Sequence, residues 1–173
     1  NLKKSAINRT KIMKKKVVLS IGSNLGNRYA LLKLAIKELQ LQFDTKCEVS
    51  KFYLTAPWGN KNQSSFINAA LTFDTSVSVY HCLELLQKIE MDFGREKTEK
   101  WGPRALDLDI IFWGDETIET HQVTIPHKHL AERDFVLKPL MDIVPDFSHP
   151  QSQATVRDLY FSISDNTTLF SKF

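Results

Sequence analysis

Two aspartates, Asp107 and Asp109, are the residues with the clearest potential for chemistry. They lie in segment 106–113, which alternates apolar and acidic residues and then becomes wholly apolar, between Pro103 and Gly114. This pattern predicts a strand. Because side chains two residues apart point to the same face of a strand, the two carboxylates would project together. Mg²⁺ prefers such oxygen ligands and completes its coordination with water and phosphate oxygens, so the pair is a candidate magnesium site.

A solvated edge strand also accounts for an Asp-x-Asp pair, so the preceding residues matter. Segment 94–104 carries four cationic side chains, Arg95, Lys97, Lys100 and Arg104. A guanidinium binds phosphate oxygens through a fork of N–H donors. The segment would therefore draw a polyphosphate towards metal ions on the aspartates. The alternative is a solvated charge run, because Glu96 and Glu99 are interspersed and would pair locally.

The elements that must position these groups follow from hydrophobic periodicity. Strand patterns occupy residues 16–21, 48–53, 66–73 and 106–113, and amphipathic helix patterns occupy residues 28–42 and 79–93. Their order is the βαββαβ pattern of a ferredoxin-like α+β fold, with helices packed on an antiparallel sheet. Extra C-terminal elements are expected: a hairpin strand at 117–121, extended chain at 123–127, a helical turn at 128–133, an apolar segment at 135–143 and a last element at 156–163.

Length and composition fit one domain with a real core. Residues 1–15 are predicted to be a basic N-terminal tail or linker, residues 16–163 the domain, and residues 164–173 a C-terminal tail. The formal net charge of +3 is too small to indicate nucleic acid by itself, and no apolar run reaches membrane-spanning length. Cys47 and Cys82 are interpreted as buried thiols of a reducing compartment. The expected location is the cytoplasm, or an organelle if the basic segment belongs to a transit peptide.

Other side chains could bind a planar ligand or serve the core. Trp58, Phe66 and Phe135 are candidate flat surfaces, although aromatic residues at such places are more often buried in the core. Asn68 interrupts an apolar strand and must find hydrogen-bond partners. His127 is interpreted as a hydrogen-bonding or phosphate-contacting side chain.

Segment 101–111, Trp-Gly-Pro-Arg-Ala-Leu-Asp-Leu-Asp-Ile-Ile, resembles the signature of the 6-hydroxymethyl-7,8-dihydropterin pyrophosphokinase family of the folate pathway. Further matches follow in family order at 21–26, 52–57, 66–70 and Pro126-His127, with Arg133 and Phe135 downstream. Together they cover the chain from about Val17 to Val144. This resemblance is far more specific than the Asp-x-Asp pair alone.

The resemblance implies transfer of pyrophosphate from the co-substrate ATP to the hydroxymethyl group of the pterin, with release of AMP. It implies two Mg²⁺ ions on Asp107 and Asp109, and charge stabilisation by Arg95 and Arg104, so that these four would be the catalytic residues. The implied nucleotide-binding set is Gln87, Glu90, Arg95, Lys97, Lys100, Trp101, Arg104, Ile110, Thr124, His127, Lys128 and Arg133.

By the same resemblance, the pterin would stack between Trp58 and Phe135, with its edge contacted by Thr55, Asn68 and the Gly22 backbone. The implied pterin-binding set is Gly22, Thr55, Ala56, Pro57, Trp58, Phe66, Asn68, Asp107 and Phe135. The sequence departs from the family in several places. Phe66 stands where relatives often have Tyr, Lys97 and Lys100 stand where the family often has Arg, and Gln122 and Lys128 replace Arg and Tyr of some relatives.

Two other functions are compatible with the predicted fold. A ferredoxin-like nucleotidyltransferase or cyclase also uses paired acids and two metal ions, but attack falls on the α-phosphorus and pyrophosphate leaves. A ferredoxin-like nucleic-acid-binding module is the non-catalytic alternative, although the acids of segment 106–113 would repel phosphate in the absence of a metal ion. The resemblance favours small-molecule substrates without nucleic acid or membrane. It also implies fusion or association with other folate-pathway enzymes.

Overall fold

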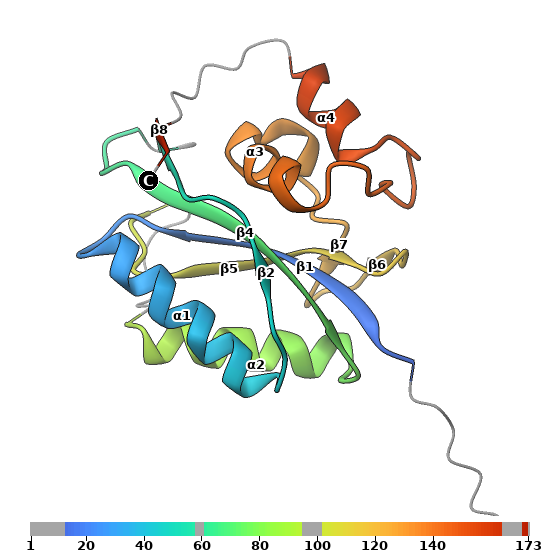
Figure 1. The fold of residues 1–173 in the computed structure, drawn as a ribbon, viewed down its shortest axis with the longest axis horizontal. Coiled ribbons are helices and arrows are strands. Elements are labelled where there is room, and N and C mark those ends of the chain that lie inside the picture. The colour runs from blue at the N-terminus through green and yellow to red at the C-terminus, as the bar shows by residue number, and fades with distance from the viewer. Residues whose placement is uncertain (1–12, 58–60, 95–101, 164–170, 173) are drawn as a thin grey trace, which may run out of the picture.

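The computed structural model describes residues 13–57, 61–94, 102–163 and 171–172 (Figure 1). Its elements, in chain order, are β1 (Lys15–Ser23), α1 (Arg28–Gln42), β2 (Glu48–Val49), β3 (Tyr53–Thr55), β4 (Phe66–Thr75), α2 (Val79–Asp92), β5 (Asp107–Trp113), β6 (Ile118–Glu119), β7 (Thr124–Ile125), the 3₁₀ turn η1 (Leu130–Glu132), α3 (Asp134–Ile143), α4 (Val156–Ser162) and β8 (Ser171–Lys172).

The main sheet has the strand order β5-β1-β4-β3-β8, with β2 also paired to β4, and β6 and β7 form a separate pair. Neighbouring strands are antiparallel, and the long strand β1 lies between β4 and β5. The segment from β1 to β5 has the predicted βαββαβ order, in which α1 and α2 connect strands of one sheet. The predicted ferredoxin-like α+β fold is confirmed.

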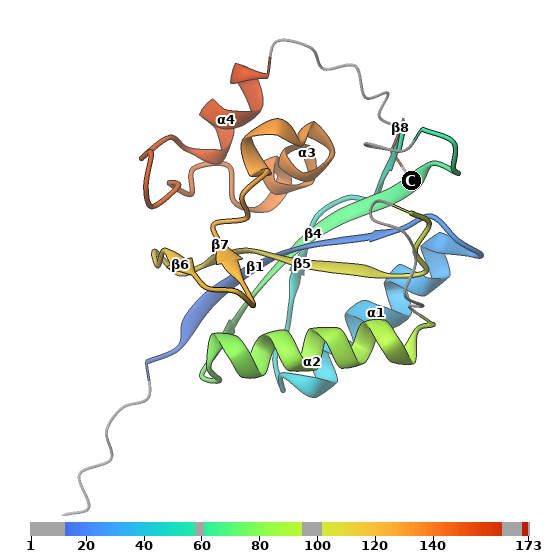
Figure 2. The same cartoon turned by 180° about the vertical axis from the view of Figure 1, so that it is seen from behind.

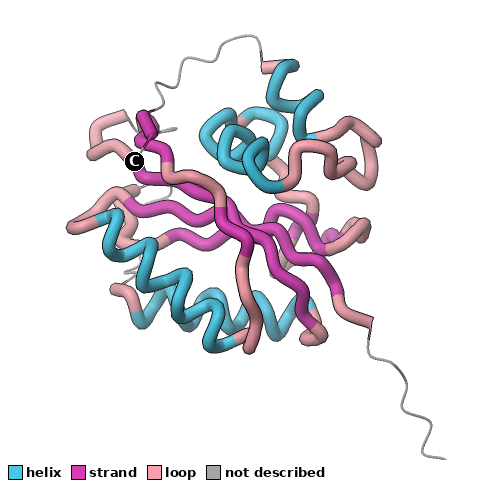
Figure 3. Tube along the Cα trace, in the orientation of Figure 1, coloured by secondary structure: helices cyan, strands magenta, loops and turns pink. Residues whose placement is uncertain are grey.

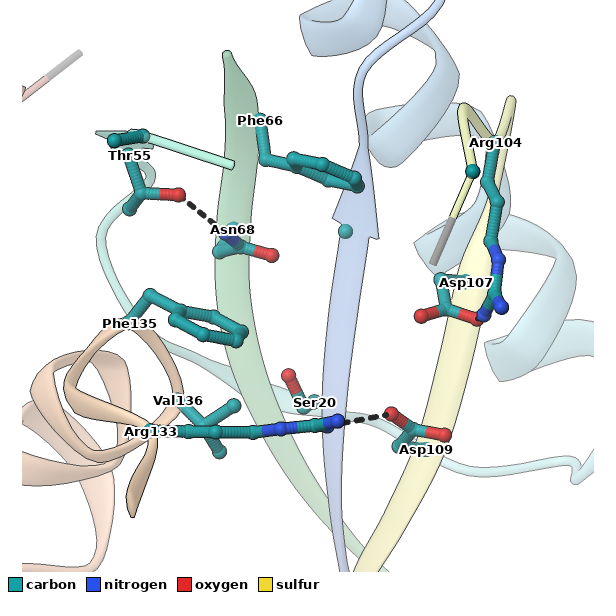
Figure 4. A pocket seen from close by; sticks show the side chains of 13 residues that line it. Ser20, Thr55, Phe66, Asn68, Arg104, Asp107, Asp109, Arg133, Phe135 and Val136 are labelled. Atoms are coloured by element: carbon teal, nitrogen blue, oxygen red, sulfur yellow. Dashed lines mark hydrogen bonds and ion pairs between the residues drawn. The ribbon is translucent and has the colours of Figure 1, made fainter. Parts of the chain in front are cut away.

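Helices cover both faces of the sheet, as Figures 1 and 2 show: α1 and α2 lie on one face, α3 and α4 on the other. Alternating residues of β1 serve the two sides. Val17, Leu19 and Ile21 join one buried cluster, with α1 and α2, whereas Val18 joins a second cluster with α3 and α4. On β5 the predicted alternation is confirmed, because Leu108 belongs to the first cluster while Asp107 and Asp109 project to the α3 side (Figure 4).

Local sequence signals explain where the helices begin and end. The Asn27 side chain accepts a hydrogen bond from the Ala30 N–H at 3.2 Å and caps α1. Ser78 caps α2, its side chain accepting from the His81 N–H at 3.2 Å. The helix α2 ends just before Gly94, whose φ of +86° suits glycine. Figure 3 shows a short loop between the end of α1 and β2.

The structure refines two predicted segments. The predicted strand at 48–53 is divided into β2 and β3, because Ser50 between them makes its own bonds to β4: its N–H donates to the Ala70 carbonyl at 2.9 Å, and its hydroxyl accepts from the Ala70 N–H at 2.8 Å. At the C-terminus, Ser171 and Lys172 pair with Leu54 and Tyr53. No helix in the described part of the chain is long and apolar enough to cross a membrane.

Candidate active site

A hollow lies on the α3 side of the sheet, where β1, β4 and β5 meet the start of α3 (Figure 4). Its walls come from segments that are distant in sequence but adjacent in the sheet. The lining residues are Ser20, Gly22, Thr55, Ala56, Phe66, Asn68, Gly102, Arg104, Asp107, Asp109, Arg133, Phe135 and Val136. We call Thr55, Phe66, Asn68 and Phe135 its aromatic end, and Arg104, Asp107, Asp109 and Arg133 its acidic end.

At the acidic end each aspartate faces a different arginine. Arg104 Nη1 donates to Asp107 Oδ1 at 2.6 Å. Arg133 Nη1 lies 3.7 Å from Asp109 Oδ2, and His127 Nε2 lies 3.9 Å from the same oxygen. The arginines therefore balance two neighbouring carboxylates that would otherwise repel each other.

Asp109 and His127 both favour their uncharged forms more than usual. Burial, and then the nearby Asp107 carboxylate, raise the pKa of Asp109 to about 7, although Arg133 opposes this. Burial, and then the Arg133 charge, lower the pKa of His127 to about 4, so the imidazole is neutral at pH 7. Its Nδ1 accepts from the His129 N–H at 3.3 Å, which leaves the proton on Nε2, towards Asp109.

The aromatic end is built from packing and neutral hydrogen bonds. The rings of Phe66 and Phe135 project into the hollow on either side of Asn68 (Figure 4). Asn68 Nδ2 donates to Thr55 Oγ1 at 2.7 Å, which leaves Asn68 Oδ1 directed across β1. A Cβ at Gly22 would overlap this oxygen, so only glycine fits there. These groups offer a flat ligand two ring faces and an amide edge.

A second hollow adjoins the first, because Asp109 lines both. The other residues of the second hollow are Leu83, Leu108, Ile110, Gln122, Val123, Thr124, His127 and Lys128. The acidic end thus lies between the aromatic end of the first hollow and the second hollow, whose lining is partly apolar and partly polar. Such an arrangement suits two ligands that react at the aspartates.

Two buried polar residues hold the segments around the acids. Glu90, 2% exposed on α2, accepts from the Leu108 N–H at 2.8 Å and so fixes the peptide between the two aspartates. Asn24, also 2% exposed, accepts from the Arg104 N–H at 2.7 Å and donates to Gln63 Oε1 at 3.0 Å. It therefore joins the segment after β1 to the segments before β4 and β5.

Comparisons with known proteins agree with this geometry. Residues 18–145 match the model of the 7,8-dihydro-6-hydroxymethylpterin-pyrophosphokinase (HPPK) family. A 2-amino-4-hydroxy-6-hydroxymethyldihydropteridine pyrophosphokinase of Bacillus subtilis is 42% identical over 126 residues, which cover 72% of this chain and 75% of that protein. The chain belongs to this family. The resemblance seen in the sequence is confirmed.

Some similar proteins are much longer than this chain and match it over only part of their length. The folic acid synthesis protein fol1 of Pneumocystis carinii is 38% identical over 150 residues, 87% of this chain but only 20% of the fungal protein. A solved HPPK-DHPS structure of Plasmodium falciparum has the same fold, with a TM-score of 0.71 at 16% identity over 92% of this chain and 47% of that chain. The chain thus spans about a fifth of the one and about half of the other.

Many of the residues expected from the pterin pyrophosphokinase family come together. Of the predicted pterin-binding set, Gly22, Thr55, Ala56, Phe66, Asn68, Asp107 and Phe135 line the first hollow, and Pro57 does not. Of the predicted nucleotide-binding set, Ile110, Thr124, His127 and Lys128 line the second hollow, while Arg104 and Arg133 line the first. Gln87 is exposed on α2 and lines neither hollow, and Glu90 is buried against β5. Trp58, Arg95, Lys97, Lys100 and Trp101 lie outside the described residues.

Several site residues were not predicted. Ser20 and Val136 line the first hollow, and Asn24 with Gln63 braces its rim. Ser20 had a signal, since it is the one polar residue inside the apolar strand pattern at 17–21. Among the described residues there is no cluster of three or more His, Cys, Asp or Glu side chains able to hold a metal ion.

Proposed function

We propose that this chain transfers pyrophosphate from ATP to the hydroxymethyl group of 6-hydroxymethyl-7,8-dihydropterin, releasing AMP, as a step of folate synthesis. The observation that carries the proposal is the position of the acids. Asp109 borders both hollows and Asp107 borders the first, so a flat alcohol and a nucleotide bound side by side would meet at the two carboxylates. Family membership supports the same reaction.

The pterin is proposed to lie in the aromatic end. Phe66 and Phe135 offer ring faces from opposite sides of Asn68, and offset stacking on aromatic rings suits a planar bicycle. Asn68 Oδ1 and the Thr55 segment would hydrogen-bond the polar edge of the pyrimidine ring. This orientation points the hydroxymethyl arm towards Asp107 and Asp109. The proposed pair is Phe66 with Phe135, because both rings line the hollow. Trp58, the partner implied by the resemblance, lies outside the described residues.

The nucleoside of ATP is proposed to occupy the second hollow, with its phosphates crossing to the acidic end. Ile110 and Val123 offer apolar contacts to a base, and Thr124 and Lys128 offer polar ones. Arg104 and Arg133 would then exchange their carboxylate partners for phosphate oxygens. Phosphoryl transfer relies mainly on positioning and charge stabilisation, which two guanidinium groups supply.

Asp107 and Asp109 are proposed to hold two Mg²⁺ ions, and the donor set fits, since Mg²⁺ in phosphate-transfer sites takes one or two carboxylates and fills its shell with water and substrate phosphates. When bound, the metal neutralises triphosphate charge and acidifies the alcohol. The hydroxymethyl oxygen forms a bond to the β-phosphorus, and the bond from that phosphorus to the α,β-bridging oxygen breaks. AMP leaves with the bridging oxygen, and the hydroxyl proton is released.

An assay of products tests the proposal. The chain is incubated with ATP, Mg²⁺ and 6-hydroxymethyl-7,8-dihydropterin, and AMP, pyrophosphate and pterin diphosphate are separated by chromatography. AMP and pterin diphosphate in equal amounts are expected, and chelation of Mg²⁺ with EDTA should abolish both. Release of inorganic pyrophosphate would instead indicate nucleotidyl transfer, and absence of any pterin product would reject the proposal.

A further inference from the structure

Ser20 is a buried hydroxyl at the floor of the first hollow. It lies near the middle of β1 on the α3 side of the sheet, is only 8% exposed, and lines the hollow. Figure 4 places its side chain between Val136 and Asp109. The small part of the Ser20 surface that remains exposed therefore faces the first hollow.

The other buried hydroxyls near it are used within the protein. Thr72 Oγ1 donates to the Val17 carbonyl at 2.8 Å, and Thr55 Oγ1 accepts from Asn68 at 2.7 Å. In the described ranges, by contrast, the Ser20 hydroxyl has no hydrogen-bond partner. Buried polar groups are nearly always hydrogen-bonded, and leaving one unsatisfied is unfavourable. The Ser20 oxygen keeps accessible surface in the hollow, so a ligand or water there can complete its hydrogen bonding.

The strand register shows which part of a ligand Ser20 would meet. On β1, Gly22 pairs with Asn68 on one side and Asp107 on the other, whereas Ser20 pairs with Ala70 and Asp109. Side chains directly opposite each other in an antiparallel pair have Cβ atoms about 4.5–5.5 Å apart. Gly22 thus leaves room for Asn68 Oδ1, which would meet the edge of a flat ring in the aromatic end. Ser20 places a hydroxyl next to the acidic end, where the substituent of that ring must react.

We propose that the Ser20 hydroxyl hydrogen-bonds the hydroxymethyl oxygen of the bound pterin and so selects pterins that carry this group. The inference rests on the proposed function, because it assumes a pterin in the aromatic end. It adds a specificity residue to the site: the ring is recognised by Phe66, Phe135 and Asn68, and the reacting arm by Ser20. Val136, beside Ser20, provides an apolar wall on the side away from Asp109.

The contact is tested by removing the hydroxyl group of Ser20 from the protein and, separately, the hydroxyl group from the ligand. Binding of 6-hydroxymethyl-7,8-dihydropterin and of 6-methyl-7,8-dihydropterin is measured by calorimetry for the wild-type chain and for Ser20→Ala, without ATP or Mg²⁺. Because a neutral hydrogen bond is worth about 0.5–1.5 kcal/mol, Ser20→Ala should bind the hydroxymethyl compound about two- to thirteenfold more weakly. Its affinity for the methyl compound should stay that of the wild type.

The controls separate this contact from a structural effect. Ser152→Ala removes an exposed hydroxyl outside both hollows and should leave both affinities unchanged. Thermal unfolding verifies that Ser20→Ala is folded, and if it is not, Ser20→Cys gives the same comparison at nearly the original volume. Equal weakening of both pterins, or weakening of neither, would overturn the inference.

The inference and the proposed function fail in distinguishable ways. A wild-type chain that binds neither pterin and forms no AMP would overturn both. A wild-type chain that forms AMP and pterin diphosphate, with a Ser20→Ala variant that keeps its full preference for the hydroxymethyl compound, would overturn only the role of Ser20.

Discussion

The aromatic end and the acidic end of the hollow are adjacent, yet different interactions hold them. At the aromatic end, Asn68 and Thr55 share a short neutral hydrogen bond and the rings are set by packing. At the acidic end, the side chains are held by opposite charges, Arg104 with Asp107 and Arg133 with Asp109. The side chains of the aromatic end are held in place by one another without a ligand. The charged groups of the acidic end are ones that phosphate and metal ions would also bind.

This difference indicates how the two ends would respond to substrate. Neutral hydrogen bonds and packed rings make a preformed slot, so binding there costs little reorganisation. Ion pairs can be exchanged, because each arginine can take a phosphate oxygen in place of a carboxylate oxygen. We therefore expect substitutions at the acidic end to affect turnover and substitutions at the aromatic end to affect pterin affinity.

Removing an acid should give the largest effect. Asp107→Ala and Asp109→Ala should each lower kcat by about a thousandfold or more, because charge stabilisation of the transferred group is worth several kcal/mol. Pterin affinity without ATP should change little. AMP formation and calorimetric titration measure the two quantities, and Asp115→Ala, an exposed acid outside the hollows, is the matched control. Turnover that survives in either variant would refute the metal-binding role.

Removing an arginine should give the second-largest effect. If the guanidinium stabilises charge in the transition state, Arg104→Ala should raise the activation free energy by about 2–4 kcal/mol. This lowers kcat by a factor of about 30 to 1000. Arg157→Ala, which loses an exposed pair with Asp146, should leave kcat unchanged. Steady-state kinetics that show a higher KM for ATP with an unchanged kcat would contradict the transition-state role.

At the aromatic end, Asn68→Ala should raise the KM for the pterin about tenfold or more while kcat at saturation stays within a few-fold, since in the proposed complex the amide contacts the part of the ligand that does not react. Asn27→Ala is a useful comparison, because it removes a helix cap and lowers stability outside the hollow. A kcat loss in Asn68→Ala comparable with that of the aspartate variants would remove the distinction between the two ends.

The smallest expected effect concerns stability. The raised pKa of Asp109, about 7 against an ordinary value near 3.8, means that the folded chain holds a proton that the unfolded chain releases. Stability should therefore fall as pH rises from about 4 to about 7 and remain lower above that range. The neutral variant Asp109→Asn should escape this loss.

Thermal unfolding without ligand measures the effect. Asp109→Asn should unfold about 2–4 °C above the wild type at pH 8, equivalent to about 1 kcal/mol for a partly exposed carboxyl, and the difference should vanish near pH 4. Saturating Mg²⁺ at pH 8 should narrow the gap by binding the wild-type carboxylates. A difference of the same size at both pH values would show that packing, and not ionisation, is responsible.

The sequence predicts the acidic end better than the aromatic end. Alternation of Leu106, Asp107, Leu108 and Asp109 along one strand determines that both acids share a face, because this relation depends only on the period of the strand. The meeting of Phe66 and Phe135 depends instead on how α3 packs across β4. No local pattern contains that information. The family resemblance implied Trp58 and Phe135 as the stacking pair and gave Phe66 only as a member of the pterin-binding set.

Individual polar residues show the same limit. The sequence suggests that Asn68 needs partners, but Thr55 as its partner follows from the pairing of β3 with β4. Glu90 was expected to contact nucleotide, and the structure gives it a backbone partner, the Leu108 N–H. Ser20 was detectable as a polar residue in an apolar strand, yet its neighbour Asp109 is known only from the register of β1 with β5.

The bond between Glu90 and Leu108 also matters for how molecules of this chain behave towards one another. β5 is the outermost strand on its side of the main sheet, and an outermost strand with free backbone groups can recruit the strand of a second molecule. Here Glu90 occupies the Leu108 N–H and the His127 N–H occupies the Ile111 carbonyl, while β8 lies along β3 at the opposite border. Lateral joining of a second sheet along β5 is thereby obstructed, whereas the opposite margin of the sheet is β8 itself.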